Sequence, residues 1–115
     1  NNGEYNKVKI LGRKTIELMT SNHTTYTPYF DGKGILSIPN LGKGFGLGFS
    51  VVTNPAETKI LNSKGTYGWG GAFGTYFQID PKEKLIYVIM IQRRPYASLK
   101  LREYFQNLVY QSIID

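Results

Sequence analysis

The stretch 65–81 reads Gly65-Thr66-Tyr67-Gly68-Trp69-Gly70-Gly71-Ala72-Phe73-Gly74-Thr75-Tyr76-Phe77-Gln78-Ile79-Asp80-Pro81, and the apolar run 85–91 follows it. Glycines are interleaved there with aromatic residues, a pattern typical of a strand whose backbone is approached closely. A glycine lacks the Cβ that would hold off a ligand or a neighbouring strand. The sequence therefore predicts a rigid strand edge whose N–H groups can face an anion.

The turn after this stretch predicts how the strands pair. Asp80-Pro81-Lys82-Glu83 places proline at the second position of a β-turn, so residues 75–79 and 85–91 are expected to form a hairpin. Upstream, residues 45–53 alternate glycine with apolar residues and then become β-branched, which predicts another strand. With residues 66–79 taken as one long strand kinked at its glycines, the expected sheet is a three-stranded antiparallel meander.

Helical patterns flank the predicted sheet. Residues 14–20 contain good helix formers with Ile16 and Met19 on one side, which predicts a short N-terminal helix. Residues 98–114 predict a C-terminal amphipathic helix with Ser98 as its N-cap. The apolar stripe of that helix comprises Leu101, Phe105, Leu108 and Val109. The expected fold class is therefore α+β.

The apolar run 85–91 indicates that part of the fold lies outside this sequence. It does not alternate with polar residues, so both of its faces are expected to be buried, and the C-terminal helix can cover only one of them. A second chain or further sequence would supply the other layer. Residues 1–115 are thus expected to form a single incomplete domain, with an irregular connection over residues 21–44 that contains proline and glycine.

Composition narrows the classes of function. The chain has 115 residues, no cysteine, one histidine and a formal net charge of +6. Disulfides and thiolate zinc sites are excluded, and His23 alone makes a poor metal site. The sequence has no apolar window of the roughly 18 residues that a membrane span needs. It begins without methionine or a signal-peptide pattern, which fits a chain that starts within a longer protein and equally fits a chain that has been processed.

Four ordered motifs carry a resemblance to a known family. They are residues 14–19, residues 44–49, Trp69-Gly70-Gly71-Ala72 and residues 76–81. Together they resemble the C-terminal part of serine β-lactamase-related hydrolases, which include class C β-lactamases, penicillin-binding proteins and esterases. The resemblance extends from about Leu11 to the end of the chain. It implies a larger β-lactamase-like α/β domain, whose missing N-terminal part is the expected partner of this chain.

The resemblance also implies a mechanism. In the family, the serine of a Ser-x-x-Lys motif attacks a carbonyl and forms an acyl-enzyme, with help from a Tyr-based motif. No serine here is followed three residues later by lysine, and no tyrosine begins Tyr-x-Asn. The nucleophile and base are therefore expected upstream of Asn1, and this chain alone is expected to be inactive. No cofactor or metal is implied, and the parent would resemble periplasmic or exported bacterial proteins.

The third family motif supplies the candidate site. Relatives carry Lys-Thr-Gly or His-Thr-Gly where this chain has Trp69-Gly70-Gly71. The resemblance implies that Ala72 offers its backbone N–H to the oxyanion of the tetrahedral intermediate and that Trp69, Gly70 and Gly71 contact an ester or amide substrate. Trp69 has no cation for the carboxylate of a β-lactam, so the motif is more similar to that of the esterase-like members.

Three other readings remain open from the sequence. The motif at Trp69 could instead be a β-bulge with the tryptophan in the core. Residues 43–49 partly match an aromatic RNA-binding strand, although Leu47 and Gly48 break that pattern and no nucleic-acid partner is expected. The chain could also be an interaction module that self-associates in order to cover residues 85–91.

Overall fold

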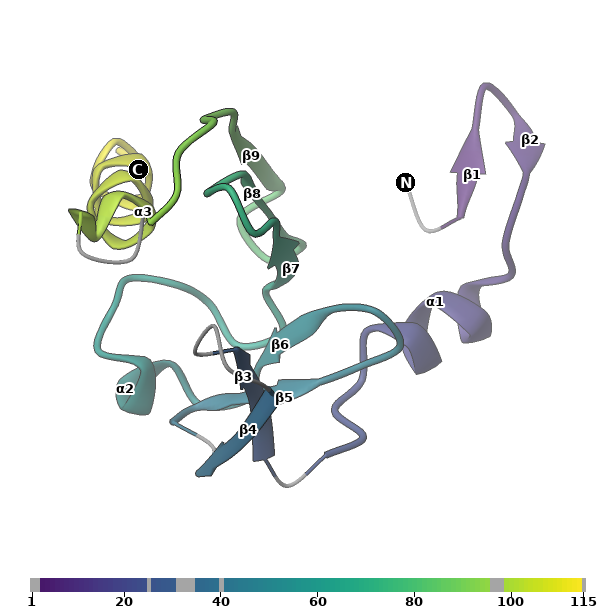
Figure 1. Cartoon of the computed structure of the whole chain (residues 1–115). Helices are drawn as coiled ribbons and strands as arrows, with labels where there is room; N and C mark the ends of the chain where they lie inside the picture. The colour runs from purple at the N-terminus through teal and green to yellow at the C-terminus, as the bar shows by residue number, and fades with distance from the viewer. Residues whose placement is uncertain (1–2, 25, 31–34, 40, 96–98, 115) are drawn as a thin grey trace.

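The computed structural model describes residues 3–24, 26–30, 35–39, 41–95 and 99–114. These residues form three antiparallel sheets and three helices (Figure 1). In chain order the elements are β1 (Glu4–Tyr5), β2 (Val8–Lys9), α1 (Arg13–Met19), β3 (Tyr26–Phe30), β4 (Ile35–Pro39), β5 (Lys43–Phe45), β6 (Ser50–Val52), α2 (Pro55–Thr58), β7 (Tyr67–Gly70), β8 (Tyr76–Asp80), β9 (Leu85–Ile89) and α3 (Leu101–Gln111). The α+β class predicted from the sequence is confirmed.

The main sheet has five strands in the order β5-β6-β7-β8-β9, and every neighbouring pair is antiparallel. The predicted meander is correct in that its strands are antiparallel. It is wrong in the number of strands, because the sheet has five rather than three. Residues 45–53 and 66–79 each divide into two short strands around a glycine with positive φ, Gly48 at +96° and Gly74 at +95°. Glycine adopts that conformation without steric cost, so the chain turns back at both positions. The predicted β8–β9 hairpin is present.

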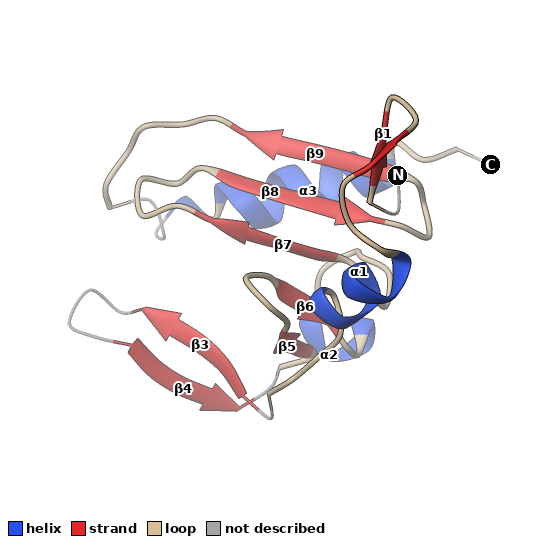
Figure 2. Ribbon diagram, turned by 90° about the vertical axis from the view of Figure 1, so that its right-hand side faces the viewer, coloured by secondary structure: helices blue, strands red, loops and turns tan. Residues whose placement is uncertain are grey.

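The segment expected to be irregular contains a hairpin. Strands β3 and β4 pair from Tyr26 opposite Pro39 to Phe30 opposite Ile35. Figure 2 shows this hairpin beside the lower end of the main sheet. The prolines at 28 and 39 suggested loop structure, but a two-stranded hairpin has only edge strands, and edge strands tolerate proline.

Helix α3 lies on one face of strands β7, β8 and β9 (Figure 2). It confirms the predicted C-terminal helix, although the proposed cap at Ser98 lies outside the described residues. The predicted apolar stripe is not the most buried face, because Leu101 and Leu108 remain 40% and 64% exposed. Phe105 of that stripe does pack against the sheet, with its ring 5.8 Å from that of Tyr87, but the most buried residue of the helix is polar, Gln106, at 2% exposed. The Gln106 side-chain amide donates to the Leu61 carbonyl at 2.7 Å.

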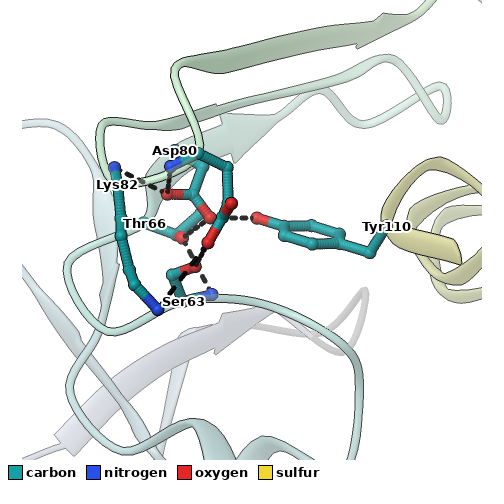
Figure 3. A network of polar contacts seen from close by, with 6 residues as sticks. Ser63, Thr66, Asp80, Lys82 and Tyr110 are labelled. Carbon is teal, nitrogen blue, oxygen red and sulfur yellow. Dashed lines mark hydrogen bonds and ion pairs between the residues drawn. The ribbon is translucent and has the colours of Figure 1, made fainter. Parts of the chain in front are cut away.

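The buried carboxylate of Asp80 joins α3 to the sheet through hydrogen bonds (Figure 3). Oδ2 of Asp80 accepts hydrogen bonds from the Tyr110 hydroxyl at 2.6 Å and from Thr66 Oγ1 at 3.0 Å. Oδ1 accepts from the amides of Lys82 and Glu83, which closes the β8–β9 turn. Asp80 and Thr66 are 1% and 0% exposed, so these hydrogen bonds replace the water that both groups lose.

The opposite face of β9 carries apolar side chains that this chain leaves exposed. Ile86, Val88 and Met90 are 66%, 53% and 80% exposed, whereas Tyr87 on the α3 side is 6% exposed. The run is therefore covered on one face only. Among the described residues, no helix is long and apolar enough to cross a membrane.

Candidate active site

The candidate site lies at the turn that joins β7 to β8. The Gly71 N–H donates to the Thr75 carbonyl at 2.8 Å, and the Gly74 N–H donates to the Gly71 carbonyl at 3.2 Å. On the far side of the turn, the Arg93 N–H donates to the Phe73 carbonyl at 2.9 Å. These hydrogen bonds fix the peptide groups of residues 71–75.

Ala72 is exposed within this turn. Its N–H donates to no acceptor among the residues that the structure describes. Backbone N–H groups in folded proteins are almost always paired with protein or water. An amide held in a fixed turn and open to solvent is therefore available to an external acceptor.

An apolar pocket of about 290 Å³ opens beside the turn. Its lining residues come from β7, the turn, β8 and the end of β9: Trp69, Gly70, Gly71, Thr75, Tyr76, Phe77, Val88, Ile89 and Met90. The three residues that the sequence predicts to contact substrate, Trp69, Gly70 and Gly71, all line this pocket. Ala72 is the next residue in the chain and is not one of the lining residues.

Trp69 forms part of the pocket wall. It lies opposite Phe77 in an uninterrupted β7–β8 register, so this position is not a β-bulge. Its ring meets Phe45 edge-on with centroids 4.9 Å apart, and the residue stays 40% exposed. The alternative that Trp69 is an ordinary core residue therefore disagrees with its exposure.

The two glycines of the motif have neighbours within the protein. A Cβ at Gly70 would lie 2.6 Å from Nη2 of Arg102, and a Cβ at Gly71 would lie 2.3 Å from Oγ1 of Thr75. Both distances are too short for a real side chain. The absence of a Cβ thus allows a close approach by the protein's own groups on this side of the strand.

Arg102 of α3 is a residue that the sequence analysis did not single out. Its Nη2 donates to the carbonyls of Gly71 at 2.9 Å and Thr75 at 2.8 Å. Its guanidinium carbon lies 5.0 Å from the centroid of the Tyr76 ring, a cation–π distance. Burial raises the pKa of the Tyr76 hydroxyl to about 12, although the nearby Arg102 charge opposes that rise.

The other residues considered from the sequence lie elsewhere. The ring Nε2 of His23 is 2.7 Å from the Leu18 carbonyl, next to α1. Phe49, which an RNA-binding strand would leave open for stacking, instead packs between the rings of Tyr67 and Phe77 at 5.4 and 6.2 Å.

An antiparallel sheet with a helix on one face and a glycine-bearing turn between two of its strands defines the class of protein. It is an α+β domain whose candidate site lies at the turn between β7 and β8. Comparison with protein families identifies which domain it is. The model of the family described as Beta-lactamase matches residues 9–111. The chain therefore belongs to the beta-lactamase family, and so to the β-lactamase-like serine hydrolases.

Two mycobacterial proteins are similar to this chain. One is named Uncharacterized protein MT1414, from Mycobacterium tuberculosis strain CDC 1551, and is 36% identical over 101 residues. The other is Protein Rv1367c of Mycobacterium tuberculosis strain H37Rv, with the same identity over the same length. In both comparisons the match covers 84% of this chain and 25% of the relative. The chain thus spans about a quarter of the length of these curated relatives.

Proposed function

We propose that this chain supplies the third active-site motif and the oxyanion wall of a serine hydrolase that acts through an acyl-enzyme on an ester or amide. The observation that carries the proposal is the Ala72 N–H, which has no acceptor among the described residues and sits in a fixed turn beside an apolar pocket. An oxyanion hole needs such a donor, held in place before the charge develops.

The apolar wall of the pocket favours esters with an apolar acyl or alcohol group. Trp69, Phe77 and Val88 present hydrocarbon and aromatic surface, and none of them carries a cation that could form an ion pair with a carboxylate. Of the class C β-lactamase, penicillin-binding protein and esterase types, the esterase type therefore agrees best with this wall.

The catalytic serine and its base belong, in this proposal, to sequence outside these 115 residues. The same sequence would form the layer over Ile86, which is exposed and does not line the pocket, and would close the outer side of the pocket at Val88 and Met90, which do line it. Covering them removes apolar surface from water, at about 25 cal/mol per Å². This larger domain is the proposed partner, and the chain alone is proposed to be inactive.

The test begins with the complete gene that encodes this chain. Its translated frame is read for Ser-x-x-Lys followed by a Tyr-based motif, and the complete gene product is assayed with p-nitrophenyl acetate and butyrate. We expect hydrolysis, and labelling of the serine of that motif by a fluorophosphonate. A complete gene product with neither the motif nor esterase activity would contradict the proposal.

A second candidate is an interaction module without catalysis. The exposed side chains of Ile86, Val88 and Met90 favour it, because a second copy of the chain could cover them. This candidate gains support if the complete gene product is inactive and elutes as a dimer.

A further inference from the structure

We infer that Arg102 is a positioning residue for the Ala72 N–H, because its guanidinium ties both ends of the 71–75 turn to helix α3. The inference rests on the proposed function, in which that N–H stabilises the oxyanion. It concerns a side chain that lies on the α3 side of the sheet and acts on the reaction only through the turn.

The contacts of Arg102 join the two ends of the turn. One nitrogen, Nη2, donates to the carbonyl of Gly71, just before Ala72, and to the carbonyl of Thr75, the last residue of the turn. The same two carbonyls accept the hydrogen bonds with which the turn closes itself, from Gly74 and Gly71. A charged donor strengthens hydrogen bonds to both.

Arg102 is itself held in place. Its guanidinium lies over the Tyr76 ring and against Gly70, where a Cβ would occupy its place. The helix that carries it is joined to the rest of the fold by Gln106 and Tyr110. The position of the turn is thus set by the position of α3.

Loss of these hydrogen bonds should affect catalysis more than substrate binding. An oxyanion donor acts on the charge that develops in the transition state, so its displacement lowers kcat. The wall formed by Trp69, Phe77 and Val88 does not depend on Arg102, so KM for an apolar ester should change little. A misplacement of about 1 Å can cost about 100-fold in rate.

The experiment compares variants of the complete gene product on p-nitrophenyl butyrate. Arg102→Met removes the donor but keeps an unbranched apolar stem, and Arg102→Lys restores a cation. Arg13→Met is the matched control, because Arg13 lies on α1 and its side chain is 65% exposed. We measure kcat per active serine titrated with a fluorophosphonate, KM, and inhibition by phenylboronic acid, whose adduct with the serine is tetrahedral.

For Arg102→Met we expect kcat to fall about 100-fold, KM to stay within about two-fold of wild type, and inhibition by phenylboronic acid to weaken in parallel with kcat. Arg102→Lys should recover part of the loss, and Arg13→Met should match the wild type. A folded Arg102→Met protein with wild-type kcat overturns the inference.

If Arg102→Met does not fold, Arg102→Gln replaces it, since Gln is too short to reach either carbonyl. The same expected values and the same overturning result then apply. If the wild-type complete gene product hydrolyses no ester, the proposed function fails and this inference falls with it. If the wild type is active and the Arg102 variants keep its kcat, this inference is wrong and the proposed function still stands.

Discussion

The hydroxyl of Tyr110 donates a 2.6 Å hydrogen bond to Oδ2 of Asp80, and so joins the last helix to the end of β8 (Figure 3). Asp80 is 1% exposed and stands at the start of the β8–β9 turn. The contact connects segments far apart in the sequence. It also holds α3 in the position from which Arg102 reaches the candidate site.

We predict that Tyr110→Phe destabilises the protein by about 1.5–3 kcal/mol, because it leaves a buried carboxylate with one donor fewer. Urea denaturation of the variant and the wild type measures the difference. Tyr104→Phe is the matched control, since Tyr104 lies on the same helix and is 62% exposed. Equal losses for both tyrosines would show that the Tyr110 hydroxyl has no special role.

Acid should remove the contribution of Asp80. Burial favours the neutral carboxyl, but hydrogen bonds from Tyr110, the Glu83 amide, Ser63 and Thr66 outweigh it and hold the pKa of Asp80 below its ordinary value. A pKa that is lower in the folded state adds stability above the unfolded-state pKa of about 3.9. That stability is lost as the pH falls through the lower, folded-state pKa.

Asp80→Asn tests this dependence. The free energy of unfolding of the wild type should decline more steeply than that of the variant as the pH falls below about 4. The measurement is a series of urea titrations from neutral pH into acid. Parallel curves for the two proteins would rule out a contribution from Asp80 ionisation.

Two glycines of the same strand should respond differently to alanine. A Cβ at Gly68 would lie 2.1 Å from the backbone carbonyl oxygen of Phe77, whereas a Cβ at Gly70 would meet only the end of the Arg102 side chain. Backbone cannot move without disturbing the sheet, so we expect Gly68→Ala to cost about 3 kcal/mol. Gly70→Ala should cost less, about 1–2 kcal/mol, because the end of the Arg102 side chain can shift, with partial loss of its hydrogen bonds to the turn.

Thermal and urea unfolding of both variants provide the comparison. Gly65→Ala adds a useful third case, because Gly65 has open space around its Cβ position but a φ of +88°. Its cost should reflect backbone strain alone, on the order of 1 kcal/mol. A Gly70→Ala variant as unstable as Gly68→Ala would show that Arg102 cannot be displaced.

The exposed face of β9 predicts self-association of the 115-residue chain. We expect it to elute from gel filtration above its monomer mass of 13.0 kDa, because Ile86, Val88 and Met90 are exposed together. Val88→Lys should shift elution toward the monomer. Leu41→Lys is the control, since Leu41 is similarly exposed, at 62%, but lies outside the main sheet.

The sequence predicted local features of the fold well, and features set by backbone conformation less well. The β8–β9 hairpin follows from Asp80-Pro81, whose turn chemistry is local. The strand breaks at Gly48 and Gly74 were missed because the presence of a glycine in the sequence does not specify the sign of its φ. Gly68, by contrast, remains within a strand. The inner face of α3 was missed because Gln106, which is buried, and Tyr110, which is partly buried, are held there by hydrogen bonds that an apolar stripe does not reveal.

The sequence predicted the residues of the candidate motif, but it did not predict the Arg102 side chain that holds the turn. Trp69, Gly70, Gly71 and Ala72 are consecutive, so a family resemblance could identify them together. Arg102 makes its contacts with backbone carbonyls of residues about thirty positions earlier, and any residue type provides such a carbonyl. Nothing in the sequence near Arg102 could have indicated that partnership.

The role proposed for Ala72 depends on one N–H, so the sharpest test removes that group alone. Replacing Ala72 with lactic acid turns its amide into an ester and deletes the donor, while the methyl side chain stays. We expect kcat of the complete gene product on p-nitrophenyl butyrate to fall about 100- to 1,000-fold, the loss typical of one oxyanion donor. KM should change little, because the substrate carbonyl carries less charge than the oxyanion. Ala72→Ser keeps the N–H and should stay close to wild type. If the ester variant retains full kcat, the oxyanion donor lies elsewhere, and Ala72 belongs only to the turn.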